Sequence, residues 1–138
     1  MAPQMQVTFD CADVPTMVRF WAGLLRYEPE PPPPPFSTWE EFARDKGIPE
    51  EMWDAWGAVI DPAGEGPRFF FQRVPEPKTA KNRMHLDLRL SRREGSEGLE
   101  AEVARAEELG AERGDEYDEL GSHWVVMRDV EGNEFCIS

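Results

Sequence analysis

The sequence has few of the features that mark membrane-spanning, secreted or nucleic-acid-binding proteins. No apolar run approaches the roughly 18 residues that cross a bilayer, and the N-terminus has neither the basic start nor the apolar stretch of a signal peptide. Lysine and arginine number 15 against 28 acidic residues, and the resulting net charge of −13 argues against a nucleic-acid partner. We therefore expect neither nucleic acid nor a membrane as a partner.

Cysteine is scarce as well. Cys11 and Cys136 lie far apart and form no CxxC spacing, which predicts a reduced, cytoplasmic protein without a disulfide framework. The chain also lacks a glycine-rich phosphate loop, a GxSxG motif and an HExxH motif. The sequence therefore lacks the commonest signatures of phosphate-binding proteins, serine hydrolases and zinc proteases.

The first part of the chain predicts a strand followed by a helix. Apolar and polar residues alternate over Met5–Cys11, which is typical of a strand with one buried face. Asp13 can cap a helix that carries Pro15 in its first turn, where the missing N–H does no harm. The helix has one apolar stripe, formed by Met17, Phe20, Trp21, Leu24 and Leu25.

A proline run and a tryptophan-rich segment then interrupt the pattern. Pro31–Pro35 predicts a stiff polyproline II spacer. The segment 36–57 predicts a helical insertion of two short helices, the first with a capping box of Ser37 and Glu40 and the second starting at Pro49. Its three tryptophans either fill a satellite core or line a ligand site: Trp39, Trp53 and Trp56.

The remaining chain predicts strands around a second helix. The helix is marked by Leu99, Val103 and Ala106 and is ended by Gly110. Short apolar or alternating runs predict strands at Ala58–Asp61, Arg68–Val74, Asn82–Leu90, His123–Met127 and Glu134–Ser138. The acidic, weakly patterned segment Glu112–Leu120 is expected to form an exposed strand. Each half thus follows the order strand, helix and further strands, and an internal βαβββ duplication that places Gln6 on His85 is the economical explanation.

The strand at Asn82–Leu90 is the most informative of these. Its apolar face consists of Met84, Leu86, Leu88 and Leu90. The opposite face carries His85, Asp87 and Arg89, so it either meets solvent or forms a polar cup that a ligand enters.

The duplication and two stretches resemble a known family. Val74–Leu88 reads VPEPKTAKNRMHLDL and Asp129–Cys136 reads DVEGNEFC, and both look like glyoxalase-like domain proteins of the vicinal oxygen chelate superfamily. That superfamily includes glyoxalase I, extradiol dioxygenases and bleomycin-resistance proteins. The resemblance implies an α+β fold in one domain, 1–138, whose modules at about 1–77 and 78–138 form a mixed sheet cupped around a cavity. It also implies a homodimer.

Metal-dependent relatives place four ligands in the cup, and the resemblance maps these onto Gln6, Gln72, His85 and Cys136. Only His85 matches a strong ligand, because Gln72 and Cys136 stand where the pattern usually has glutamates. Two neutral amides, one thiol and one imidazole are a poor set for octahedral metals, so no metal or other cofactor is favoured. A zinc or copper(I) site stays open, as does a catalytic Cys136–His85 pair.

A third kind of chemistry rests on carboxylates. Asp10 and Asp87, on equivalent polar faces, either form an acid/base pair or are solvated or bonded to Arg89.

We therefore expect a small-molecule-binding protein, metal-free, with a polar-lined cavity for a hydrophobic or aromatic ligand, as in relatives that sequester antibiotics. The alternative is a metal-dependent lyase or oxidoreductase acting on a vicinal-oxygen substrate, so the residues leave open whether the protein is an enzyme. The cavity is expected to be lined by Gln6, Thr8, Trp53, Trp56, Phe70, Gln72, His85, Asp87 and Cys136. Because short helices must dock on something, we also expect at least one indole of the insertion at the cavity mouth, within ~10 Å of His85.

Overall fold

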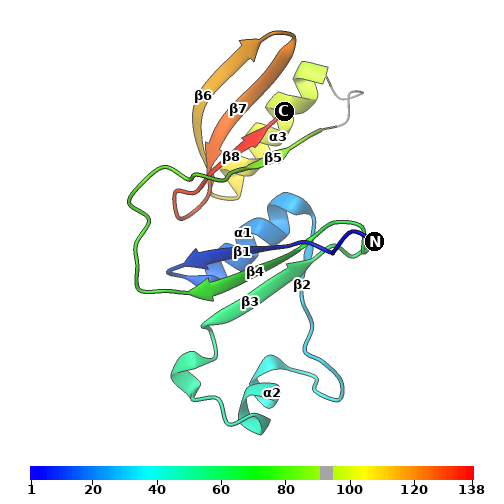
Figure 1. Ribbon diagram of the computed structural model, residues 1–138, viewed down its shortest axis with the longest axis vertical. Coiled ribbons are helices and arrows are strands. Elements are labelled where there is room, and N and C mark those ends of the chain that lie inside the picture. The colour runs from blue at the N-terminus through cyan, green and yellow to red at the C-terminus, as the bar shows by residue number, and fades with distance from the viewer. Residues whose placement is uncertain (91–94) are drawn as a thin grey trace. The chain divides into compact units, whose positions relative to one another are not determined.

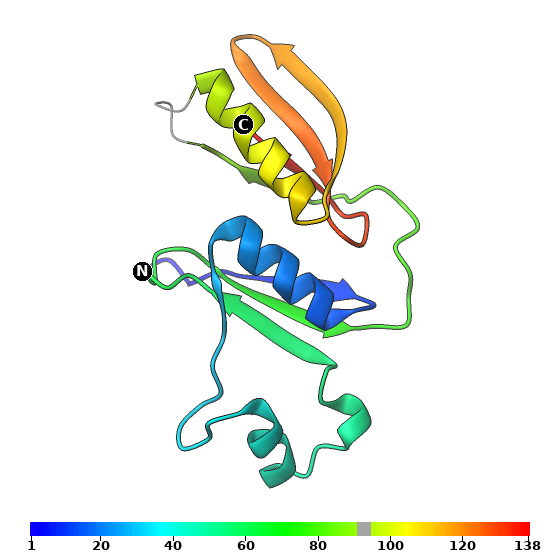
Figure 2. The same ribbon diagram turned by 180° about the vertical axis from the view of Figure 1, so that it is seen from behind.

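The alternating residues of β1 (Gln6–Cys11) divide the first sheet into two faces. Its apolar residues turn toward α1 (Val14–Leu25), which begins at the Asp13 cap and carries proline in its first turn, as predicted. The core between them is aromatic: the rings of Phe9 and Trp21 lie 5.1 Å apart, and those of Trp21 and Phe69 lie 5.6 Å apart. Figure 2 shows α1 lying along one face of this sheet.

The computed structural model describes residues 1–90 and 95–138 and divides into two compact units, Met1–Pro77 and Lys78–Ser138. The first unit continues with β2 (Glu28–Pro29), α2 (Trp39–Asp45), a 3-10 helix (Glu50–Met52), β3 (Trp56–Ile60) and β4 (Arg68–Arg73). Its sheet has the order β1-β4-β3-β2, with β1 and β4 parallel and the other pairs antiparallel (Figure 1). The insertion that carries α2 connects β2 to β3 and extends away from the side of the sheet that these two strands form.

The second unit repeats this topology. It contains β5 (Leu86–Leu88), α3 (Gly95–Glu108), β6 (Glu112–Glu119), β7 (Ser122–Arg128) and β8 (Glu134–Ile137) in the sheet order β5-β8-β7-β6. Again the first strand pairs in parallel with the last. The helix buries Leu99, Val103 and Ala106, and the sheet buries Val125, Met127, Phe135 and Ile137. The predicted α+β fold of two βαβββ modules is confirmed.

Several predicted boundaries were wrong. The strand predicted over Asn82–Leu90 contains only Leu86–Leu88, and Met84, expected on its buried face, is exposed. The capping box lies one residue later than predicted: Thr38 caps α2, accepting from the Glu41 N–H, while the Glu41 carboxylate accepts from the Ser37 N–H. Thr38 takes this place because its backbone is extended immediately before the first helical turn.

The proline run and the end of the insertion also differ from the prediction. The polyproline spacer is interrupted by a turn, which the Phe36 N–H closes by donating to the Pro33 carbonyl. Trp56 and Gly57 belong to β3 rather than to a helix, because their backbone pairs with Gln72 and Phe71 of β4. β2 was not predicted, since a two-residue strand carries no periodic pattern.

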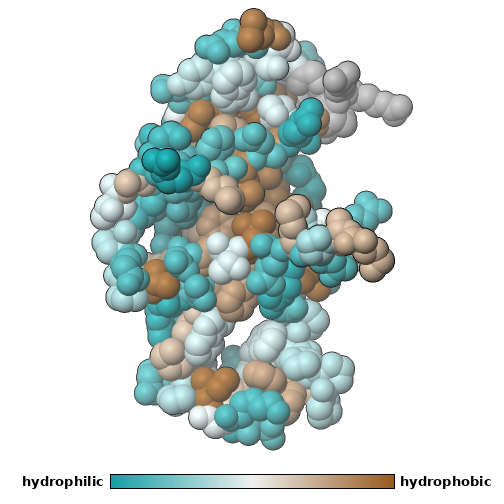
Figure 3. Space-filling view, viewed as in Figure 1, coloured by the Kyte–Doolittle hydropathy of each residue, from teal (hydrophilic) through white to brown (hydrophobic). Residues whose placement is uncertain are grey.

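The surface agrees with the composition. On the side drawn in Figure 3, hydrophilic residues predominate on both units, and some hydrophobic side chains are exposed in the insertion. Within residues 1–90 and 95–138, no helix combines the length and the apolar character needed to span a bilayer.

Candidate functional site

The face of the second sheet opposite α3, here called the second open face, carries a row of three side chains on adjacent strands. Asp87 of β5 pairs with Cys136 of β8, which in turn pairs with Val126 of β7. Side chains alternate along a strand, so their neighbours in sequence point the other way. Those on β8 and β7 are buried, whereas Leu86 and Leu88 of β5 are partly exposed. Three consecutive strands thus present a carboxylate, a thiol and an apolar side chain to one surface.

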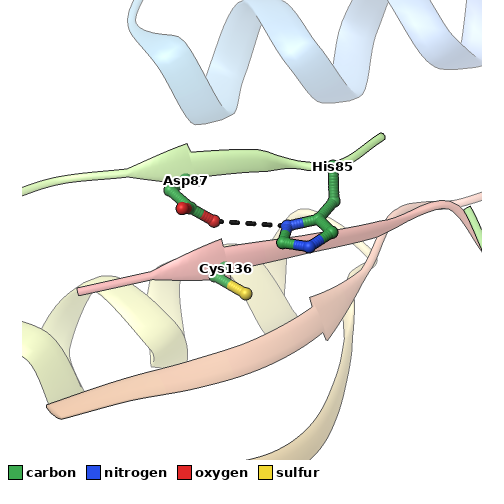
Figure 4. Close-up of side chains that lie close together, drawn as sticks. All are labelled: His85, Asp87 and Cys136. Atoms are coloured by element: carbon green, nitrogen blue, oxygen red, sulfur yellow. Dashed lines mark ion pairs between the residues drawn. The ribbon is translucent and has the colours of Figure 1, made fainter. Parts of the chain in front are cut away.

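His85 precedes β5 by one residue and completes a cluster with two members of this row. The Nδ1 atom of His85 lies 3.4 Å from Oδ1 of Asp87, and the ligand atoms of His85, Asp87 and Cys136 all lie within 4.8 Å of one another. In Figure 4 the imidazole and the carboxylate point toward each other, and the thiol of the neighbouring strand lies close to both. The pair predicted to need contact, Cys136 and His85, therefore does lie close together.

The thiol of this cluster is held in its protonated form. Burial raises the pKa of Cys136, and the charge of Asp87 together with the hydrogen bond that the thiol donates to it raises the pKa further. A thiolate, not a thiol, is the nucleophile and the metal ligand. The arrangement therefore opposes a Cys136 nucleophile activated by His85.

A hollow of about 1030 Å³ lies over this cluster. This volume lies just above the range typical of ligand pockets, roughly 300–1,000 Å³. Besides the cluster, residues that line it include Lys81, Ser122, His123, Trp124, Val126 and Glu134. Ionisable, hydroxyl and aromatic groups thus converge on one concave surface within the second unit, as they do in a small-molecule site.

Glu134 is a site residue that the sequence analysis missed. Its carboxylate accepts a hydrogen bond from the Asn82 N–H at 2.9 Å and lies 3.2 Å from the Lys78 ammonium. Burial opposes ionisation, but these partners outweigh it and lower the pKa of Glu134. The signal was present, because Glu134 stands two residues before Cys136 and a strand places such residues on one face.

The face of the first sheet opposite α1, here called the first open face, is tied together by side-chain bonds. The Arg68 guanidinium donates to Oε1 of Gln6 at 2.7 Å and pairs with both oxygens of Glu30. Gln72 donates from Nε2 to Oδ1 of Asp10 at 2.6 Å. Of the two expected acid/base carboxylates, Asp10 therefore has an amide partner, whereas Asp87 lies against His85 and Cys136.

The tryptophans of the insertion line a second pocket, of about 380 Å³, within the first unit. Trp39, Trp53 and Trp56 all contribute to it, together with Phe70 and Arg68 of β4. The three tryptophans thus line a pocket, and that this pocket is a ligand site stays a prediction. We also expect an indole within ~10 Å of His85. The indoles belong to the first unit and His85 belongs to the second, so this distance stays a prediction.

The nine expected cavity residues fall into two groups. The first unit holds Gln6, Thr8, Trp53, Trp56, Phe70 and Gln72, and the second holds His85, Asp87 and Cys136. Contacts join members within each group: Gln6 donates to the Thr8 hydroxyl at 3.3 Å. That the nine residues line one cavity stays a prediction.

Comparison with known proteins identifies the family. The family model of the glyoxalase-like domain matches residues 6–138, so the chain belongs to the glyoxalase-like domain family. No protein of curated function gave a significant match.

Solved structures share the fold of this chain. The chain is similar to a glyoxalase/bleomycin resistance protein/dioxygenase family enzyme from Burkholderia phytofirmans, with 15% identity, a TM-score of 0.68, and coverage of 99% of this chain and 97% of that chain. It is also similar to a mutant of the fosfomycin resistance protein FosX from Listeria monocytogenes in complex with Mn(II) and 1S,2S-dihydroxypropylphosphonic acid. The identity there is 12%, the TM-score 0.67, and the coverage 99% and 89%. At such identities the likeness shows the fold alone.

The residues at the four mapped ligand positions fit such a metal poorly. At Gln6 the amide oxygen already accepts from a guanidinium, so a cation there would meet a positive charge. Cys136 stands where the metal-dependent pattern usually has a glutamate, so this position adds no carboxylate oxygen for a hard cation. Of these four residues, only His85 is a strong metal ligand. We therefore derive no metal-dependent step from the four mapped positions.

Proposed function

We propose that this protein binds a small molecule on the second open face and does so without a metal. The observation that carries the proposal is the hollow of about 1030 Å³ over His85, Asp87 and Cys136. One exposed imidazole and one exposed carboxylate stand at 3.4 Å from each other and can orient a polar group of the ligand. Trp124 and Val126 supply apolar surface beside them.

The ligand class follows from the lining. A hydrophobic or aromatic molecule with one polar group would bury its ring on Trp124, whose indole already stacks on Tyr117 with centroids 5.3 Å apart. Its polar group would face His85 and Asp87. Sequestration of an antibiotic of this kind fits a site that binds without activating a nucleophile or a metal. We also propose a reduced, cytoplasmic setting, because the sequence has only two cysteines, Cys11 and Cys136, and they form no CxxC spacing.

A metal-dependent lyase or oxidoreductase is the second candidate, and one observation favours it. The ligand atoms of His85, Asp87 and Cys136 lie within 4.8 Å of one another, which suits a metal ion with mixed nitrogen, oxygen and sulfur ligands. Against this candidate, the four positions that the resemblance maps as metal ligands offer two amides and no carboxylate.

Metal content separates the two candidates. Full-length protein, expressed in medium supplemented with zinc, manganese and nickel and purified without chelator, is analysed by elemental mass spectrometry. We expect well under one metal per chain, and we expect the same low content for His85→Ala. Stoichiometric metal that disappears in His85→Ala would overturn the metal-free proposal and support the second candidate.

The resemblance to dimeric relatives also leads us to propose a homodimer. Solution scattering over a wide concentration range should give the mass of two chains. A single-chain mass throughout would contradict the homodimer and leave the metal-free site untouched.

A further inference from the structure

We propose that the tryptophan pocket of the first unit is by itself a binding site for an uncharged, planar aromatic molecule. The proposal does not rest on the proposed function, because every residue that lines this pocket belongs to Met1–Pro77. Its volume of about 380 Å³ lies at the lower end of the usual range for ligand sites, enough for a molecule of roughly two fused rings.

The indoles that line the pocket are held in place by bonds at their pyrrole edges. Trp39 donates from Nε1 to the Glu30 carbonyl at 2.8 Å, and Trp53 donates from Nε1 to the Ile48 carbonyl at 2.9 Å. These bonds fix two rings whose remaining surface lines an apolar space. A pocket whose walls are fixed in advance loses little conformational entropy when a ligand enters.

Trp56 supplies an exposed aromatic wall of the pocket and a hydrogen-bond donor. It is 48% exposed although it belongs to β3, and its indole N–H has no acceptor among the described residues. Trp39 is 44% exposed. Two half-exposed indoles on one pocket leave a large apolar surface in water, which a flat ring would cover. The free N–H can donate to an oxygen on the ligand.

The charges at the pocket select against ionised ligands. Three charged side chains line it, and each already has a partner: Glu30 pairs with Arg68 at 2.5 Å, and Asp54 pairs with Arg73 at 2.7 Å. One face of the Trp53 ring also holds the Arg44 guanidinium at 5.1 Å. An ionised ligand would lose hydration without gaining an unpaired counterion, so a neutral ring binds best.

The five tryptophans of the chain provide a test that locates the ligand. In protein labelled with ¹⁵N, each indole N–H gives its own NMR signal, assigned through single Trp→Phe variants. The probe is 2-naphthol, a neutral bicyclic molecule with one hydroxyl. We expect its titration to shift the signals of Trp39, Trp53 and Trp56 and to leave the core residue Trp21 unchanged. Trp124 reports separately on the hollow of the second unit.

Variants and charged probes complete the test. Trp53→Phe and Trp56→Phe should each weaken 2-naphthol binding about two- to tenfold, and Ala43→Leu, which fills the pocket from a buried lining position, should weaken it at least as much. Tyr27→Phe, an aromatic change at a residue of the first unit that does not line the pocket, is the control and should leave the affinity unchanged. 2-Naphthoate and 2-naphthylmethylamine should bind about tenfold more weakly than the neutral probe.

Three outcomes would overturn the inference. They are shifts confined to Trp124, no shift of the three insertion signals up to the solubility limit of 2-naphthol, and an affinity that is insensitive to both Trp53→Phe and Trp56→Phe. Shifts at Trp124 alone would still agree with a ligand site on the second open face. The two proposals therefore fail separately.

Discussion

Arg68 and Gln6, which are 62 positions apart in the chain, are joined by a hydrogen bond of 2.7 Å from the guanidinium to the amide oxygen. The same guanidinium pairs with Glu30 on its other side and lies over the Phe70 ring at 5.2 Å. Arg68 thus links the β1 edge of the first sheet to the segment that follows β2. It also occupies the oxygen that a metal at Gln6 would need.

The first prediction concerns the energy of the Arg68–Glu30 pair. A double-mutant cycle of Arg68→Met and Glu30→Gln should give a coupling energy of about 0.5–1 kcal/mol, because the pair has two hydrogen bonds but is partly exposed. Urea unfolding of the four proteins measures it, and added salt should reduce it. The cycle for the exposed pair Asp45–Lys46 is the control and should give a coupling near zero. Equal coupling energies for the two pairs would contradict a stabilising contribution of the Arg68–Glu30 pair.

A second prediction tests the packing of α1 on β3. A Cβ at Gly57 would lie 2.9 Å from Cγ2 of Val18 and 3.0 Å from Cγ1 of Val14. Gly57→Ala should therefore lower the free energy of unfolding by about 1–3 kcal/mol, since short β-branched side chains cannot turn away. Adding Val18→Ala should recover part of that loss, although Val18→Ala alone destabilises. Two independent, additive losses in urea unfolding would refute the proposed clash.

The helix cap at Asp13 gives a third prediction. Its carboxylate accepts from the Thr16 N–H at 3.2 Å and from the Thr16 hydroxyl at 2.7 Å. Asp13→Ala should cost about 1 kcal/mol near neutral pH. The Thr16 hydroxyl bond, and then its backbone bond, lower the pKa of Asp13, so the charge-dependent part of this stability is present above the ordinary carboxyl pKa. It is lost as the pH falls through the lower folded-state value.

Urea unfolding of Asp13→Ala and of the natural sequence across the acid range measures this difference. The gap between the two proteins should narrow toward low pH. A gap that stays constant or widens in acid would contradict the role of the ionised cap.

The fold was predictable because its main elements are periodic and local. The stripe of α1, the cap at Asp13 and the alternation of β1 depend on neighbours within a few residues, so composition and spacing reveal them. The strand at Leu86–Leu88 shows the limit. Alternation continued over Asn82–Leu90, but only the three residues that pair with β8 form a strand, and alternation alone carries no information about where a partner strand ends.

The candidate site was predictable only in part. His85, Asp87 and Cys136 follow from strand periodicity and from the resemblance, and the structure brings them together. Arg68 was not singled out, since its bonds to Gln6 and Glu30 span 62 and 38 positions. Contacts of that range depend on how the strands order in the sheet, and no local pattern encodes them.

The last prediction concerns the reactivity of Cys136. In a Cys11→Ala background, the rate of alkylation by iodoacetamide should follow the thiolate fraction of Cys136 and rise only above the pH at which an ordinary cysteine reacts. Burial is the larger cause of the raised pKa, and Asp87 adds to it by its charge and by accepting the thiol proton in a hydrogen bond. Asp87→Asn removes the charge, so its rate–pH curve should move to lower pH. Because burial remains, the curve should still lie above that of a free thiol. Asp10→Asn, a matched change in the first unit, should leave the rate–pH curve where it is.

The raised pKa of Cys136 also affects stability. The protonated thiol stabilises the fold below the unfolded-state pKa of about 8.5, and this contribution is lost as the pH rises through the higher folded-state value. A curve for Asp87→Asn that is unchanged, or moved to higher pH, would show that the thiol does not donate to Asp87, and the site would then have to be rebuilt without that bond.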